Sequence, residues 1–101
     1  MNMQQMMAQA QKMQRELRKA MEELAKQEFS VNKGGAVTVT LMGDGSLKSI
    51  EIDEDAFEKD NKEMIQDLIV MAVNELSEKI EEAKEEINEK ITGSRNGFGG
   101  F

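Results

Sequence analysis

The sequence predicts an α+β protein built from a long helix, a three-stranded antiparallel sheet and a second long helix. In the first and last parts of the chain, apolar residues recur every three or four positions, which is typical of amphipathic helices. Between them, apolar and polar residues alternate, and glycines interrupt the alternation as they do between hairpin strands. A chain of 101 residues has the length of one domain. We expect that domain over residues 1–92, followed by a disordered glycine-rich tail over 93–101.

The first helix is predicted over residues 3–27, where no Gly or Pro interrupts the chain. Its apolar residues follow a heptad a/d pattern, which makes a seam of Met3, Met6, Ala10, Met13, Leu17, Ala20 and Leu24. If Met3 is position a, every base falls at position b, c or f, opposite the seam: Lys12, Arg15, Arg18, Lys19 and Lys26. The helix therefore has an apolar face that needs a partner and a basic face.

Three strands are predicted over residues 29–33, 36–42 and 46–52. The alternation is that of Val37, Val39 and Leu41 with the residues between and after them, Thr38, Thr40 and Met42. After the turn "GDG", Ile50 and Ile52 alternate with Ser49 and Glu51. Gly34 and Gly35 supply the turn between the first two strands. The simplest arrangement is a three-stranded meander between the helices.

The second helix is predicted over residues 61–91. Its apolar positions repeat every eleven residues, which favours a nearly straight stripe over a left-handed supercoil. The stretch "QDLIVMAVNEL" is apolar around most of the helix, so we expect it to pack on the sheet on one side and on another chain on the other. The predicted dimer interface comprises Leu68, Ile69, Ala72, Val73 and Leu76.

Charge is distributed unevenly along the chain. The net charge is −7, and residues 55–92 hold twelve of the 20 acids. This balance argues against unselective coating of DNA or of an anionic membrane, but it leaves room for a local basic face. The first 28 residues hold five bases and four acids, so we look for such a face on the first helix.

The residue inventory argues against an enzyme. There is no His, Cys or Tyr, and no serine has an evident base beside it. The acid-rich "DEDAFEKD" lacks the central Gly and the twelfth-position Glu of a calcium loop. No signal region and no run of roughly 18 apolar residues is visible. We expect a soluble, cytoplasmic, non-enzymatic protein with no cofactor, no metal, no small-molecule substrate and no membrane partner.

Several strings, taken in order over nearly the whole chain, resemble the YbaB/EbfC family of bacterial nucleoid-associated proteins. They are "QAQKMQREL", "VTVTLMGDG", "LKSIEID", "DNKEMIQDLIVMAVNEL" and the glycine-rich end "GGF". The resemblance implies an intertwined, tweezer-like homodimer that binds duplex DNA, with the projecting helices as arms. It also implies a place on the nucleoid and an influence on nucleoid organisation and gene expression.

Applied to this sequence, the resemblance makes the first-helix bases the DNA-binding candidates: Lys12, Arg15, Arg18 and Lys19. Secondary candidates lie on the second helix, surrounded by acids: Lys79, Lys84 and Lys90. Contacts from Lys and Arg to phosphates give affinity without reading the base sequence.

Two alternatives stay open. Helix, hairpin, helix is also the layout of prefoldin-type chaperones, and the methionines at the start of the first helix would suit binding of unfolded chains: Met1, Met3, Met6 and Met7. The other alternative is a structural adaptor for a cytosolic protein, which predicts neither DNA binding nor client binding.

Overall fold

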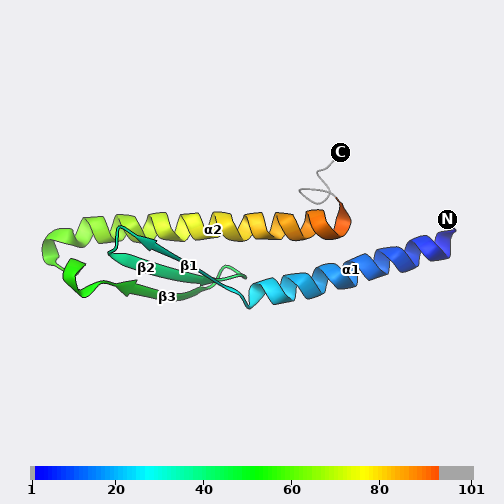
Figure 1. Ribbon diagram of the computed structural model, residues 1–101, viewed down its shortest axis with the longest axis horizontal. Helices are drawn as coiled ribbons and strands as arrows, with labels where there is room; N and C mark the ends of the chain where they lie inside the picture. Colours follow the sequence, from blue (N-terminus) through cyan, green and yellow to red (C-terminus); the bar gives the residue numbers. More distant parts are fainter. Residues whose placement is uncertain (1, 94–101) are drawn as a thin grey trace. The chain divides into compact units, whose positions relative to one another are not determined.

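The structure is a computed structural model that describes residues 2–93 of the 101. The elements follow in the order α1 (Met3–Ala25), β1 (Glu28–Lys33), β2 (Val37–Met42), β3 (Leu47–Ile52) and α2 (Lys62–Thr92), with two 3₁₀ turns, η1 (Glu54–Ala56) and η2 (Lys59–Asn61), before α2 (Figure 1). The predicted α+β order is confirmed. Of the predicted tail, all but Gly93 lies outside the described residues.

The chain divides into two compact units. One contains α1 up to Leu24 together with α2 from Glu82 onward, and the other spans Ala25–Glu81. In the first unit the half-buried apolar residues recur at helical spacing: Met13, Leu17 and Ala20 on α1, and Ala83, Ile87 and Ile91 on α2. The second unit contains the sheet, both 3₁₀ turns and the longer part of α2.

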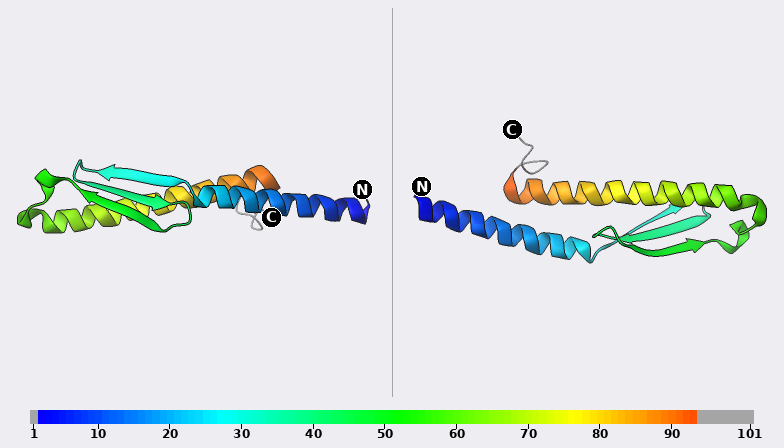
Figure 2. Two further views of the ribbon diagram at one scale, coloured as in Figure 1. Left: turned by 90° about the horizontal axis from the view of Figure 1, so that it is seen from below. Right: turned by 180° about the vertical axis from the view of Figure 1, so that it is seen from behind.

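The sheet has the strand order β1-β2-β3, and both pairings are antiparallel (Figure 2). Val31, Val39 and Ile50 lie opposite one another across the three strands. The register of β3 shifts between Thr40 and Leu41, so that Lys48 forms a bulge without a partner on β2. After the bulge, Ile50 and Ile52 alternate with Ser49 and Glu51 along β3, as the sequence predicts.

Glycines and side-chain caps form both turns of the meander. Gly34 and Gly35 have φ values of 61° and 69°, and the Gly35 N–H donates to Asn32 Oδ1 at 3.0 Å. In the second turn, the Ser46 N–H donates to Asp44 Oδ1 at 2.8 Å beside Gly45, whose φ is 88°. These positive φ values favour glycine because a Cβ would crowd the backbone.

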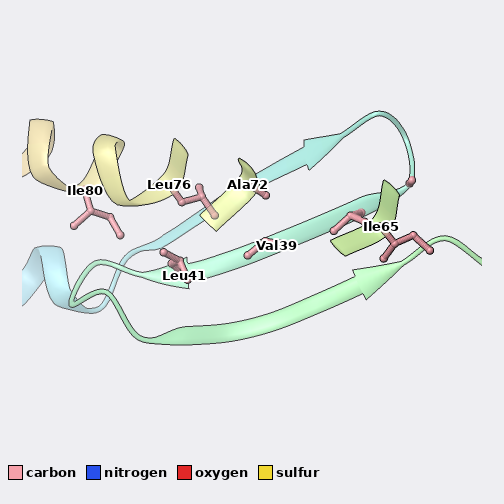
Figure 3. Close-up of a cluster of buried hydrophobic side chains, with 8 residues drawn as sticks. Val39, Leu41, Ile65, Ala72, Leu76 and Ile80 are labelled. Carbon is pink, nitrogen blue, oxygen red and sulfur yellow. The ribbon is translucent and has the colours of Figure 1, made fainter. Parts of the chain in front are cut away.

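The core lies between one face of the sheet and the part of α2 in the same unit. Figure 3 shows Ala72 and Leu76 of α2 facing Val39 and Leu41 of β2. The buried cluster is completed by Ala36, Val37, Ile65 and Ile80. Burial of a Leu, Ile or Val side chain contributes roughly 1.5–3 kcal/mol, so these side chains hold the helix on the sheet.

The other face of the sheet is polar. Asn32 Nδ2 donates to Thr38 Oγ1 at 2.9 Å, and the hydroxyls of Ser30 and Thr40 lie 3.0 Å apart. These side chains bond one another across β1 and β2. Only one face of the sheet therefore requires an apolar cover.

Three helix ends differ from the predicted bounds, and one of them is the end of α2, which lies at Thr92 and not at residue 91. α1 ends at Ala25 because the residues that follow bond to the sheet. The Gly43 N–H donates to the Gln27 carbonyl at 2.9 Å, and Glu28 is paired with Met42. α2 begins at Lys62 because the residues just before it form η2, where Asn61 Nδ2 donates to the Ala56 carbonyl at 3.0 Å.

Candidate nucleic-acid interface

The basic face of α1 is open to solvent. Its side chains, Lys12, Arg15, Arg18 and Lys19, are all exposed. Within residues 2–93, no acid forms an ion pair with any of the four. Their charges and hydrogen-bond donors are therefore available to an external anion.

The start of α1 is fixed by a reciprocal cap. The Gln5 N–H donates to Asn2 Oδ1 at 2.8 Å, and the Asn2 N–H donates to Gln5 Oε1 at 3.4 Å. This is the capping-box arrangement with Asn and Gln as its members. The helix then continues without interruption to Ala25, so the four bases are carried on one regular element.

Helical geometry places the bases on one side. Lys12 and Lys19 are seven residues apart, or about 10 Å along the axis, and Arg15 and Arg18 lie between them. The opposite side holds the half-buried Leu17 and the buried Leu24. This burial matches the two-faced helix that the heptad pattern predicts, and a basic row of this length can contact successive phosphates of one strand.

The secondary candidates on α2 do not form a comparable row. In a regular helix, Lys79 and Lys90 fall on one side, and Lys84 points roughly 120–140° away. Lys79 Nζ lies 3.8 Å from Glu75 Oε2, and Lys84 is half-buried. The first set of bases is therefore the more accessible one.

The predicted dimer residues divide into two groups. Ala72 and Leu76 are 0% exposed in the single chain, so they belong to its own core. Leu68, Ile69 and Val73 pack against the core but keep part of their surface open.

Sequence reasoning missed several exposed apolar residues of the sheet unit. Leu47 and Ile50 on β3 are 54% and 40% exposed, although they share the strand face that elsewhere packs on α2. Phe57 is 72% exposed and lines a groove of about 380 Å³ with Ile65 and Gln66. In the sequence, the only indication of this exposed surface was the apolar residue type at positions 47, 50 and 57.

Nothing in residues 2–93 suggests a metal centre, because no group of three or more acids or other metal ligands comes together there. No helix in the same part of the chain has the length and apolar composition needed to cross a bilayer. Within residues 2–93 the exposed bases of α1 have no acidic partner, and such a basic helix face is typical of a protein that binds a polyanion.

The comparisons with known proteins agree with this class. The model of the YbaB/EbfC DNA-binding family matches residues 1–95, and the chain belongs to that family. A nucleoid-associated protein of Saccharopolyspora erythraea is 42% identical over 99% of this chain and 87% of its own length. Proteins of the same description from Enterococcus faecalis and Mycoplasmopsis pulmonis are 43% and 38% identical, over 96% and 97% of this chain and 94% and 97% of their own lengths. The resemblance seen in the sequence is confirmed.

Proposed function

We propose that this protein binds duplex DNA as a homodimer on the bacterial nucleoid, in the cytoplasm, without catalysing a reaction, and so influences nucleoid organisation and gene expression. One observation carries the proposal: an acidic chain of net charge −7 has four exposed bases together on α1, and none of them is paired with an acid among residues 2–93. Solvated acids and bases usually intermix on a surface, and a one-sided row of bases is the footprint of a phosphate backbone.

The contacts we propose are to phosphates. Lys12, Arg15, Arg18 and Lys19 present their charges along about 10 Å of helix. A homodimer carries two such rows, so four to eight phosphate contacts are expected. Contacts to phosphates release counterions, which makes binding weaken steeply as salt is added.

The proposed dimer surface lies on the side of the sheet unit next to β3. Lys33 of β1 binds Glu75 of α2, so β1 lies on one flank of the helix and β3 on the other. We define the β3 flank as the apolar residues on that second side: Leu47, Ile50, Ile69, Val70 and Val73. Ile69 and Val73 come from the predicted interface, and the other three are exposed.

A second copy is the occupant that the β3 flank suits best. A single chain of this length buries a small core, and association supplies the missing apolar contact. Contiguous apolar patches on a protein surface commonly mark interaction sites. Obligate homodimer interfaces are in turn more apolar than other interfaces.

The experiment for this proposal is a titration of labelled duplex with the full chain at several salt concentrations, with sedimentation used to measure the size of the free protein. We expect a dimer, and a log-log salt slope of roughly −4 to −7 for four to eight phosphate contacts. Absence of binding at low salt, or an affinity that does not change with salt, would contradict the proposal that the basic face of α1 binds DNA phosphates.

A prefoldin-like chaperone is the second candidate, and the exposed Met3, Met6 and Met7 are the observation that favours it. Flexible methionine surfaces suit many partners. Client binding through apolar contacts would persist in salt that screens charges. Suppression of aggregation of an unfolded client at high salt, without duplex binding at low salt, would favour this reading.

A further inference from the structure

The apolar seam of α1 extends beyond the part of the helix that is covered. Met3, Met6 and Met7 are 76%, 58% and 58% exposed. Further along the same seam Leu17 is half-buried, and Leu24 is only 4% exposed. The first turns of α1 therefore have the same apolar spacing as the buried part of the helix, but no other residue of the described chain buries their side chains.

The same turns carry no charge. Residues 2–11 consist only of Asn, Gln, Met and Ala, and Lys12 has the first charged side chain. The rest of the chain is strongly acidic, so copies of this protein repel one another over most of their surface. We call residues 2–11 the uncharged end of α1. It is a segment at which two copies can meet without repulsion.

We propose that the uncharged end of α1 binds the same segment of a chain in another dimer, which joins neighbouring dimers. The proposal rests on the homodimer of the proposed function. Met3, Met6 and Ala10 occupy a, d and a positions, and such a seam fits a second helix with the same seam. Met7 and Gln9 flank it at e and g, so no charge opposes self-pairing. An acidic or basic partner would find no complementary charge here.

The contact is weak when it acts alone. Three turns from each of two helices bury much less than the roughly 1,200 Å² of a stable specific interface. Dimers held side by side on one duplex present many such ends at high effective concentration, and the weak contact then becomes effective. The surface therefore joins dimers in proportion to their local density.

The test uses the absence of cysteine from the chain. Met6→Cys places a single thiol on the seam, and Ala8→Cys places one at position f, on the opposite face of the same turn. Each full-length variant is treated at high concentration, without DNA, with a short bismaleimide linker, and the particles are sized under native conditions. We expect Met6→Cys to give covalently linked four-chain particles, several-fold more than Ala8→Cys.

Equal linking at both positions, or linked chains that remain in two-chain particles, would overturn the inference. Sedimentation before linking tests the homodimer separately. A protein that sediments as a single chain would contradict the proposed function, whereas a dimer that does not link to other dimers would contradict only this inference. As a second measure, Met3→Gln and Met7→Gln are introduced together into the Met6→Cys chain, and this should lower the four-chain fraction several-fold at unchanged helix content. An unchanged fraction would also overturn the inference.

Discussion

Lys33 on β1 and Glu75 on α2 form a salt bridge in which Lys33 Nζ lies 2.7 Å from Glu75 Oε1. The two residues are 42 positions apart in the chain, and their side chains are 25% and 35% exposed. The hydrogen bond from Lys33 lowers the pKa of the Glu75 carboxyl below its usual value, and the charges of Lys33 and Lys79 act in the same direction. Partial desolvation opposes them and does not reverse the shift.

The pair predicts a pH-dependent contribution to stability. Because the pKa of Glu75 is lower in the folded than in the unfolded protein, its carboxylate stabilises the fold above the unfolded value near 4.5, and this effect disappears as the pH falls through the folded pKa. The Tm of the wild type should exceed that of Glu75→Gln at pH 7, and the gap should narrow below pH 4.5. Thermal unfolding from pH 7 to 3 measures this, with Glu78→Gln as an exposed control. A gap independent of pH would contradict the assignment.

Leu76 should be among the most costly residues to truncate. It is 0% exposed and contacts the β2 face of the core, so Leu76→Ala should lower the free energy of unfolding by roughly 2–5 kcal/mol. If that variant does not fold, Ile80→Val should still cost roughly 0.5–1.5 kcal/mol. Urea unfolding at one protein concentration gives both values. Ser77→Ala, exposed on the same helix, should stay within about 0.5 kcal/mol of the wild type.

The β1-β2 turn should tolerate Asn better than Ala. Gly35 has a φ of 69° with open space around it, so Gly35→Ala pays only the left-handed backbone cost of roughly 1–2 kcal/mol. Asn visits this region more readily, and Gly35→Asn should lose less. At Gly34 a new Cβ would lie 3.6 Å from Leu68 Cδ1, an ordinary contact, so Gly34→Ala should match Gly35→Ala. A much larger loss at Gly34 would contradict the geometry of this turn.

The β3 flank should control dimer affinity. Ile50 and Glu51 are neighbours on opposite faces of β3, and both are exposed. Ile50→Ser should weaken the dimer roughly ten-fold, because loss of an interface anchor costs more than about 1 kcal/mol. Glu51→Ser should leave the dimer constant within two-fold. Sedimentation equilibrium distinguishes the two, and equal effects would place the interface elsewhere.

The order of elements could be predicted because each depends on local signals. The heptad pattern of α1, the alternation of Val37, Val39 and Leu41, and the turn glycines are all read within a few residues. The bulge at Lys48 and η2 before α2 were not predicted, because they follow from strand register and from the Asn61 contact with Ala56.

The candidate sites could be predicted only in part. The heptad positions alone put the α1 bases opposite the seam, and the structure has those bases exposed. The letters of "DLIVMAVNEL" indicate burial, but they do not say which chain provides the cover. The chain's own sheet covers Ala72 and Leu76, whereas the neighbouring Ile69 and Val73 stay partly open and belong to the surface that we propose as the dimer interface. The bond from Lys33 to Glu75 joins distant segments and has no local signal.

DNA binding by α1 is tested by a comparison of two variants that lose the same number of positive charges. One replaces Lys12, Arg15, Arg18 and Lys19 with Ala. The other replaces four bases of α2 and the turn before it: Lys59, Lys62, Lys79 and Lys90. After both are shown to have the wild-type oligomeric state, each is titrated into the same duplex at several salt concentrations.

We expect the α1 variant to lose duplex affinity by at least roughly 100-fold, with a flatter salt slope, because each lost phosphate contact lowers the slope by about one. The α2 variant should stay within a few-fold of the wild type. Equal losses in the two variants, or a larger loss in the α2 variant, would contradict the claim that α1 is the DNA-binding helix.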